Sequence, residues 1–355
     1  MITTKQLIFA LLPIVGTILW HLVDTTPSLA FYDLLVRDTD FANQTIWITG
    51  ASSGIGASLV CQFAKHAAHG NGPSHVILSA RREAKMKDVL QTCRRDATKE
   101  NASATASTMG TTFSVVPYDA LDATTTEKTV QQAIESTPAR SIDVLILNSG
   151  IYQLQPALEM TTEERRKLAR VNLEAPIELS QALIQQDHWK ERGRGHLVVV
   201  SSIMSKGPHS LCSFYAATKA GLRSYFQTLS LEEFDWLKVN MVLPGATASD
   251  MWKNSLDDET VQVDQSGMMT PERVAHLIVK AMAGPTFLFW EVWISKANGL
   301  FYVFMSHYFP GLFYALNHIA GIARMAEFRK SNSDVIDIPS WIQILYQEAV
   351  IRLKG

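Results

Sequence analysis

Six short runs of β-branched and apolar residues recur between residues 45 and 245, and helical stretches separate them. Few polar residues interrupt these runs, which is typical of strands buried on both faces of a parallel sheet. The alternation favours right-handed βαβ units and a doubly wound α/β sheet, the Rossmann fold. The predicted strands cover residues 45–50, 75–80, 113–119, 143–148, 196–202 and 239–245, and the predicted helices cover 56–69, 83–95, 125–137, 161–186 and 214–235.

The chain is 355 residues long, and we expect one catalytic domain over residues 40–283. Residues 6–23 contain no Asp, Glu, Lys or Arg. The length of this segment is near the lower limit of roughly 17–25 residues for a helix that spans a membrane. We therefore expect a membrane anchor at residues 1–24. A cleaved signal peptide and a buried helix are the alternatives. The few flanking basic residues leave the topology open.

Residues 284–355 form an expected C-terminal extension that is helical and rich in aromatic side chains. Eleven of the 32 aromatic residues fall within residues 286–315, and no Asp, Glu, Lys or Arg occurs within 297–323. The sequence Phe-Pro-Gly at residues 309–311 is expected to break this segment. Contact with membrane lipid or with an apolar pocket would explain the composition, and a homodimer face is the alternative.

The overall charge and the cysteines exclude other classes of function. The net charge is −2 and no block of Lys and Arg occurs, so nothing indicates a nucleic-acid partner. Cys61, Cys93 and Cys212 are widely spaced and form neither a metal-ligand pattern nor a disulfide framework, so we interpret them as buried or free thiols and expect no metal site. The polar segment 96–112 is predicted to be a surface loop, and Asn43 and Asn101 begin glycosylation sequons that indicate a luminal location only weakly.

The sequence TGASSGIG, residues 49–56, lies between the first predicted strand and the first predicted helix. Gly50 permits a tight turn, Gly54 allows the backbone to approach a pyrophosphate, and Gly56 allows the helix to pack on the strand. The phosphates would meet amides at the helix start near Ile55, with Ser52 and Ser53 in the turn. This turn predicts a dinucleotide site.

The end of the second strand should determine which dinucleotide binds. An acidic residue there would bind the ribose hydroxyl of NAD, but this chain has Ala80 followed by Arg81 and Arg82. A guanidinium group can pair with a 2′-phosphate through two hydrogen bonds. We therefore expect NADP(H), with NAD less favoured.

Four polar residues could form a proton-transfer unit. Tyr215 and Lys219 lie four residues apart and thus on one helical face. Ser202 ends the fifth predicted strand, and Asn172 lies in the helix before it. Free tyrosine has a pKa near 10, and a nearby ammonium group is expected to lower that value toward the range where a general acid or base works well.

The Thr-Gly-x-x-x-Gly-x-Gly and Tyr-x-x-x-Lys motifs, in this order, resemble those of the classical short-chain dehydrogenase/reductases over residues 43–283. The family's serine lies thirteen positions before the tyrosine, which selects Ser202 and excludes Ser201. The resemblance implies that Tyr215 exchanges a proton with the substrate oxygen, Ser202 binds that oxygen, Lys219 holds the ribose, and Asn172 maintains a proton path.

The resemblance also implies further cofactor contacts. Asp119 matches the position that contacts the adenine, and Asn148 and Gly150 keep the turn after the fourth strand, although Leu147 replaces an asparagine there and puts one polar contact in doubt. After the sixth strand Pro244 and Gly245 keep the family's pattern, whereas Thr247 replaces its common valine and Ser249 its common threonine. Either of these two hydroxyls could bind the nicotinamide carboxamide. Residues 246–270 are expected to cover the substrate.

The segments EVWISK (291–296) and AEFRKS (326–331) resemble a membrane-attached subgroup typified by dehydrogenase/reductase member 7. The resemblance implies an NADP(H)-dependent oxidoreductase in the membrane of the endoplasmic reticulum. Its substrate would be a small lipophilic carbonyl or alcohol of steroid or retinoid type. A lipid-biosynthetic ketoreductase and a non-catalytic nucleotide-binding scaffold are the alternatives.

Overall fold

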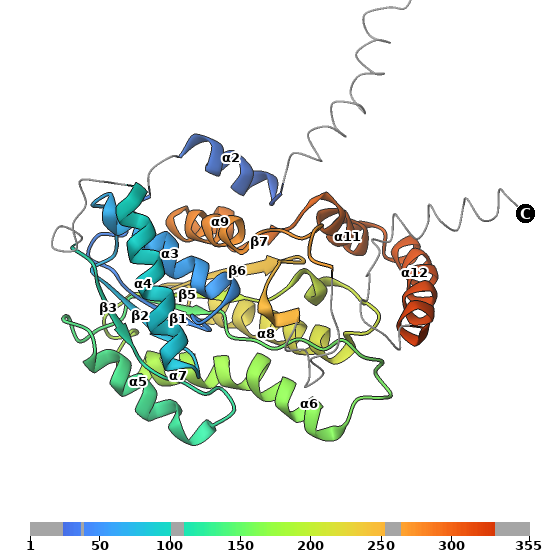
Figure 1. Ribbon diagram of the computed structural model, residues 1–355, viewed down its shortest axis with the longest axis horizontal. Helices are drawn as coiled ribbons and strands as arrows, with labels where there is room; N and C mark the ends of the chain where they lie inside the picture. Colours follow the sequence, from blue (N-terminus) through green and yellow to red (C-terminus); the bar gives the residue numbers. More distant parts are fainter. Residues whose placement is uncertain (1–23, 37–38, 101–109, 253–263, 331–355) are drawn as a thin grey trace, which may run out of the picture.

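The computed structural model describes residues 24–36, 39–100, 110–252 and 264–330, and its core is a seven-stranded parallel sheet (Figure 1). The strand order is β3-β2-β1-β4-β5-β6-β7, with a crossover from β3 to β4, as a doubly wound sheet requires. The prediction of a Rossmann-like sheet is confirmed. The strands are β1 (Thr45–Thr49), β2 (His75–Ser79), β3 (Thr112–Val115), β4 (Val144–Leu147), β5 (Gly195–Val200), β6 (Leu237–Pro244) and β7 (Glu291–Ile294).

Helices cover both faces of this sheet. Along β1, Ile46 and Ile48 face one buried cluster and Trp47 faces the other, because successive strand residues point to opposite faces. Helices α3 (Gly54–Ala68), α4 (Glu83–Glu100) and α9 (Pro271–Ala283) cover the first face, with α2 (Pro27–Leu35) packed outside α9. The second face carries α5 (Thr126–Glu135), α7 (Ala175–Gln186) and α8 (Ser213–Glu232), and α6 (Thr162–Ala169) packs near α8.

The seventh strand was not predicted from the sequence. Strand β7 has only four residues, begins with a charged one and lies within the aromatic-rich segment, so its pattern gave no strand signal. It pairs with β6 in parallel, and Thr25 forms an antiparallel bridge to Ile294 on its other side. The sheet therefore extends beyond residue 283, where the catalytic domain was expected to end.

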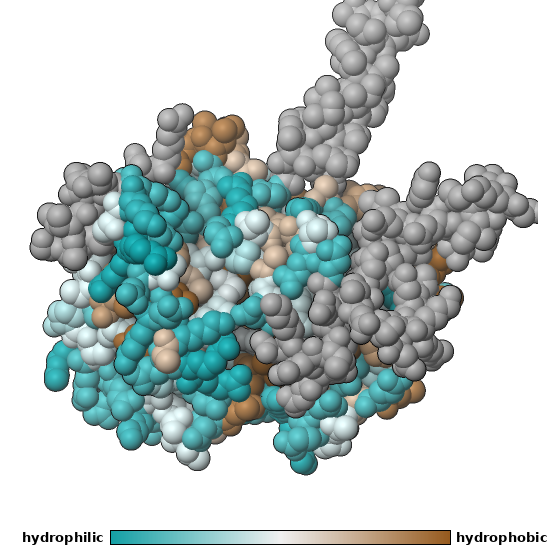
Figure 2. All heavy atoms as spheres, viewed as in Figure 1, coloured by the Kyte–Doolittle hydropathy of each residue, from teal (hydrophilic) through white to brown (hydrophobic). Residues whose placement is uncertain are grey.

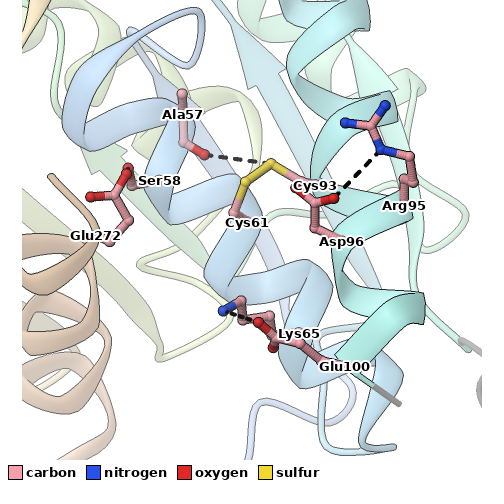
Figure 3. The surroundings of a disulfide bond; sticks show 9 residues. All are labelled: Ala57, Ser58, Cys61, Lys65, Cys93, Arg95, Asp96, Glu100 and Glu272. Atoms are coloured by element: carbon pink, nitrogen blue, oxygen red, sulfur yellow. Dashed lines mark hydrogen bonds and ion pairs between the residues drawn. A yellow bond between two sulfur atoms is a disulfide. The ribbon is translucent and has the colours of Figure 1, made fainter. Parts of the chain in front are cut away.

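The interpretation of all three cysteines as buried or free thiols is wrong for two of them. Cys61 on α3 and Cys93 on α4 form a disulfide bond, with their Cα atoms 4.6 Å apart (Figure 3). The two helices lie side by side on one face of the sheet, a proximity that the 32-residue separation in sequence does not reveal. Cys212 is free and buried, as expected.

The structure moves one predicted boundary and confirms a predicted break. Helix α4 continues to Glu100, so the first residues of the expected surface loop are helical, and residues 101–109 lie outside the described part of the chain. The expected break at residues 309–311 is present, because α11 (Ala297–Tyr308) ends before Phe309 and Pro310 begins α12 (Pro310–Lys330). The short helix α10 (Thr286–Phe289) precedes β7.

The predicted membrane anchor, residues 6–23, falls outside the described residues. Over residues 24–36, 39–100, 110–252 and 264–330, every helix is too short or too polar to cross a bilayer. The segment expected to cover the substrate is described only up to Trp252 and again from Asp264.

Candidate functional site

A cleft of about 740 Å³ opens at the carboxyl ends of the parallel strands. Ligands of open α/β sheets bind at this edge, where the strand order reverses. The cleft brings together nearly all the predicted site residues, while Gly56 and Asn172 lie just behind its wall. Those that line it are Gly50, Ser52, Ser53, Gly54, Ile55, Arg81, Arg82, Asp119, Asn148, Gly150, Ser202, Tyr215, Lys219, Pro244, Gly245, Thr247 and Ser249.

The glycine turn between β1 and α3 has the geometry that its sequence predicts. Gly50 and Gly54 have φ angles of +69° and +54°, a region that favours glycine. A Cβ atom on Gly56 would lie 2.2 Å from the carbonyl oxygen of Gly50. The side chain of Ser53 does not cap α3, so it leaves the first amides of this helix for another acceptor, such as a phosphate.

Thr49, the last residue of β1, links the start of this turn to the end of the neighbouring strand β4, a role that sequence reasoning missed. Its hydroxyl donates to the carbonyl of Ile146 at 3.1 Å and accepts from the amides of Asn148 and Ser149 at 2.9 and 3.2 Å. The Asn148 side chain donates to the Thr49 carbonyl at 3.0 Å. Polar contacts therefore join β1 to β4 although Leu147 is apolar and buried.

Two exposed arginines border the cleft beyond β2. The Nη2 atom of Arg82 lies 3.4 Å from the hydroxyl of Ser52, and neither Arg81 nor Arg82 forms an ion pair with a described carboxylate. Asp119 lies across the same end of the cleft, and its Oδ1 accepts from the amide of Leu121 at 3.0 Å. Arg81 and Arg82 therefore present positive charge next to the glycine turn.

Tyr215 and Ser202 meet at the other end of the cleft. Burial raises the pKa of the Tyr215 phenol to about 12, and its hydrogen bond with Ser202 opposes that shift. The expected fall in the pKa of Tyr215 is therefore wrong for this site, because burial outweighs the neighbouring polar groups. The Ser202 hydroxyl accepts from the amide of Met204 at 3.2 Å, and it lies 3.5 Å from the Pro244 carbonyl.

A buried glutamine, Gln153, caps the start of α8, and no sequence pattern predicts this role. The Oε1 atom of Gln153 accepts from the amides of Phe214 and Tyr215 at 2.9 and 3.0 Å. These amides are among the first four of the helix, which lack partners within it. Gln153 therefore takes the capping role and positions Tyr215 through its backbone.

Lys219 lies one turn along α8 from Tyr215. Its Nζ atom donates to the Val200 carbonyl at 3.0 Å and lies 6.0 Å from the centre of the Tyr215 ring. Burial lowers the pKa of Lys219 to about 8. The Ser201 hydroxyl donates to the Lys219 carbonyl at 2.9 Å, which commits that serine to the backbone and leaves Ser202 facing Tyr215.

Asn172 is fully buried in a π-helical turn, Arg170–Glu174, between α6 and α7. Its amide group exchanges two hydrogen bonds of 2.9 Å with the backbone of Ile151, and its Nδ2 lies 3.4 Å from the hydroxyl of Thr218. A Cβ atom on Gly150 would lie 3.4 Å from both Asn172 and the Nζ of Lys219. Asn172 therefore holds the turn after β4 against α8, and π-helical turns of this kind frequently occur at functional sites.

The end of the cleft beyond Tyr215 is apolar and aromatic. The Tyr152 ring lies 4.8 Å from that of Tyr215 and 4.7 Å from that of Trp252, and Met204 and Met251 complete this wall. Behind it, Met325 and Phe328 of α12 pack against the same cluster. The C-terminal extension thus supports the end of the cleft that lies away from the glycine turn.

A nicotinamide-type nucleotide turn and a Ser-Tyr-Lys group in one cleft define a short-chain dehydrogenase, and residues 44–260 match the short chain dehydrogenase family model. The chain belongs to this family. It is similar to dehydrogenase/reductase SDR family member 7 of Mus musculus, with 29% identity over 84% of each chain. It is also similar to 11-beta-hydroxysteroid dehydrogenase A of Sesamum indicum, with 27% identity over 72% of this chain and 70% of that one.

Solved structures share the fold. A short-chain dehydrogenase from Sphingobium yanoikuyae in complex with NADPH is 25% identical to this chain and superposes with a TM-score of 0.53. The match covers 66% of this chain and 82% of that structure. The match to the family model spans strands β1–β6 and the residues that line the cleft.

Proposed function

We propose that this protein is a membrane-associated, NADP(H)-dependent oxidoreductase that interconverts carbonyl and hydroxyl groups on a lipophilic substrate. The observation that carries the proposal is the meeting of Tyr215 and Ser202 beside buried Lys219, in a cleft that also contains a glycine turn and two unpaired arginines. Short-chain dehydrogenases act on alcohols and carbonyls, so the family membership supports the reaction class.

Tyr215 exchanges the proton with the substrate oxygen in this proposal. Its phenol is protonated at neutral pH because burial raises the pKa, and this state suits proton donation during carbonyl reduction. Ser202 donates a hydrogen bond to the same oxygen, as its place beside Tyr215 allows. Lys219 is mostly charged below pH 8 and favours the phenolate that forms when the proton leaves. Asn172 is a positioning residue that holds the turn carrying Gly150.

The residues of the glycine turn fit a dinucleotide. The missing Cβ at Gly56 lets α3 pack closely on the Gly50 backbone, and the uncapped start of α3 leaves amide donors for a pyrophosphate. Arg81 and Arg82 would bind a 2′-phosphate, and Asp119 would contact the adenine. Thr247 and Ser249 would hold the nicotinamide carboxamide near Pro244 and Gly245. NADP(H), when bound, supplies or accepts the hydride.

The substrate end of the cleft favours a lipophilic molecule. Its wall consists of aromatic and methionine side chains, and helices α11 and α12 expose further apolar residues beside it. The name of the hydroxysteroid relative supports a substrate of this class. Residues 1–24 would anchor the chain in the membrane of the endoplasmic reticulum. Residues 40–283 together with β7 would form the catalytic unit, and residues 284–355 would contact lipid or substrate.

The test is NADPH consumption by the full chain against steroid, retinoid and long-chain keto substrates. Turnover of a steroid or retinoid ketone supports the proposal. Turnover confined to a ketosphinganine or a 3-ketoacyl chain would assign the lipid-biosynthetic alternative. NADPH binding without turnover of any of these substrates would favour the non-catalytic scaffold.

A further inference from the structure

Helix α2 differs from an ordinary surface helix in its outer face: Leu29 is buried on the inner face, as is usual, but the charge of the helix also lies inward. Its one charged residue, Asp33, points toward α9, where it accepts from Arg273 at 2.8 Å and bonds His276 at 2.7 Å. Its outward face carries Phe31, Leu34 and Leu35, which are 65%, 76% and 61% exposed. A surface helix in water normally places apolar residues inward and charge outward. The outer face of α2 is therefore built for an apolar neighbour.

Helix α10 extends the same apolar surface. The rings of Tyr32 on α2 and Phe289 on α10 pack edge to face with their centres 5.1 Å apart, which joins the two helices. Figure 2 shows the hydrophobic side chains gathered over α2 at the upper edge of the molecule. We call the exposed group the α2–α10 patch, and it consists of Phe31, Leu34, Leu35, Phe287, Leu288 and Trp290. Residues 282–290 contain no charged side chain, so the patch has no ionic rim on that segment.

The chain is fixed to the domain at the residue where this surface begins. The carbonyl of Asp24 accepts from the amide of Ser295 at 3.0 Å, and the amide of Thr26 donates to the Trp293 carbonyl at 3.0 Å. Arg273 also binds both carboxylate oxygens of Asp24, at 2.8 and 3.0 Å. These contacts hold the backbone directly after the charge-free residues 6–23, so no free linker separates that segment from the domain.

This attachment limits how far the patch can lie from the segment that precedes it. Neighbouring Cα atoms are about 3.8 Å apart, so residue 23 stays close to Asp24 wherever the segment runs. Residues 24–27 span at most roughly 10 Å and the nine-residue α2 about 14 Å, so its exposed Phe and Leu side chains lie within roughly 25 Å of the attachment. A bilayer that holds residues 6–23 is therefore within reach of the patch.

We propose that the α2–α10 patch lies in the interface of a lipid bilayer and sets the orientation of the catalytic domain on the membrane. The proposal rests on the membrane association proposed above, and it names a lipid surface as the partner of this patch. Leu and Phe side chains gain by leaving water, and Trp is enriched at the level of the lipid headgroups. The ion pairs of Arg273 with Asp24 and Asp33 then act as a rigid joint between anchor and domain.

The test places a fluorophore on the patch of the full chain. Leu34→Cys and Phe287→Cys are labelled with bimane, since the native disulfide and buried Cys212 leave no accessible thiol among the described residues. Leu158→Cys is the matched control, because Leu158 is an apolar residue that is 100% exposed far from α2 in sequence. Each protein is reconstituted in phosphatidylcholine vesicles with or without a nitroxide near the start of one acyl chain.

We expect the nitroxide lipid to reduce the fluorescence at positions 34 and 287 by about twofold or more and to leave position 158 unchanged, because interfacial helices sit roughly 5–10 Å into the headgroup boundary. Equal quenching at all three positions would overturn the proposal, as would a chain that does not sediment with vesicles. A different result would show that the patch contacts a second copy of the chain instead. In that case the protein would have the mass of two chains in detergent, and both patch labels would be shielded from iodide but not quenched by the nitroxide lipid.

NADPH consumption is measured on the same samples so that the two proposals can fail separately. Active protein with unquenched patch labels would overturn the docking surface alone. Inactive protein with quenched labels would contradict the proposed oxidoreductase and leave the docking surface supported.

Discussion

The two ends of the cleft are built in different ways. At the cofactor end, backbone geometry makes the site: Gly50 and Gly54 adopt positive φ angles and Gly56 leaves no room for a side chain. At the substrate end, buried side chains from distant parts of the chain make it, as Tyr152, Tyr215 and Trp252 pack together and α12 supports them. A backbone site is sensitive to added atoms, whereas a side-chain site is sensitive to lost functional groups.

The largest effect should come from removing one functional group at the substrate end. Tyr215→Phe should lower kcat by about 10²–10⁴-fold, the usual contribution of a positioned general acid, while NADPH still binds. Tyr152→Phe is the matched control, because this neighbouring phenol bonds Cys212 rather than Ser202. Steady-state kinetics and NADPH fluorescence titration measure both effects. Equal losses in the two variants would mean that the aromatic cluster, and not the Tyr215 proton, carries the activity.

At the cofactor end, one added methyl group should be enough to block binding. The new Cβ atom of Gly56→Ala would lie 2.2 Å from the Gly50 carbonyl oxygen, so the turn must shift and the NADPH dissociation constant should rise by about 10²-fold, as a few kcal/mol of overpacking implies. Gly110→Ala, with nothing within 4 Å of its new Cβ, should change nothing. Tight NADPH binding by Gly56→Ala would show that the backbone at this end is not the constraint we describe.

The two arginines test whether side-chain charge matters at the cofactor end as well. Arg81→Asp should raise the KM for NADPH by about 10–100-fold, the range expected for losing hydrogen bonds to a charged group, and should not raise the KM for NADH. Arg95→Asp on exposed α4 lies outside the cleft and serves as the control. An unchanged ratio of the two KM values would contradict the assignment of NADP(H).

The disulfide supports the cofactor end from behind, by joining the helices that follow β1 and β2. Cys93→Ser should lower the free energy of unfolding by about 3–4 kcal/mol, the chain-entropy value for a cross-link across 32 residues. Urea titration followed by circular dichroism measures the loss. Reduction of the wild-type protein should lower its free energy of unfolding by the same amount and should not destabilise the variant further. A variant as stable as the oxidised wild type would show that the disulfide does not contribute to the stability of the fold.

The smallest effect concerns the stability of the substrate end. Burial lowers the pKa of Lys219 to about 8 from an ordinary value of 10.5, so the unfolded chain binds more protons between these pH values. Lys219 therefore destabilises the fold fully below pH 8, and this cost disappears as the pH rises toward 10.5. Lys219→Met should be inactive, yet its free energy of unfolding at pH 7 should exceed that of the wild type by roughly 1–3 kcal/mol, once the loss of the hydrogen bond to Val200 is subtracted. This difference should shrink at pH 10. Lower stability of the variant at pH 7 would contradict this account.

The sequence revealed the cofactor end better than the substrate end for a physical reason. Glycines at fixed spacing and apolar strands are local signals, so β1–β6 and the turn at residues 49–56 were predicted from single segments. Thr49 and Gln153 act through contacts with residues that lie far along the chain, and ordinary polar residues in loops or strand ends carry no signal for such roles.

The errors have similar causes. The disulfide depends on two helices packing side by side, and β7 gains its strand structure by pairing with β6, so neither shows in the spacing of residues. The pKa of Tyr215 was expected to fall because Lys219 is close in sequence, but the depth of burial, which sequence does not give, decides its direction.

The pairing of Thr25 with β7 has a consequence for the order in which the protein matures. Thr25 donates a hydrogen bond to the carbonyl of Trp293, 268 residues later. At roughly 5–20 residues per second, a ribosome needs about 13–54 seconds to add that many residues. The segment after residue 23 must therefore wait, among the first residues to be synthesised, for one of the last parts of the sheet. Docking of residues 24–26 onto β7 is thus a late step of folding, possible only after the ribosome has added the residues that line the cleft.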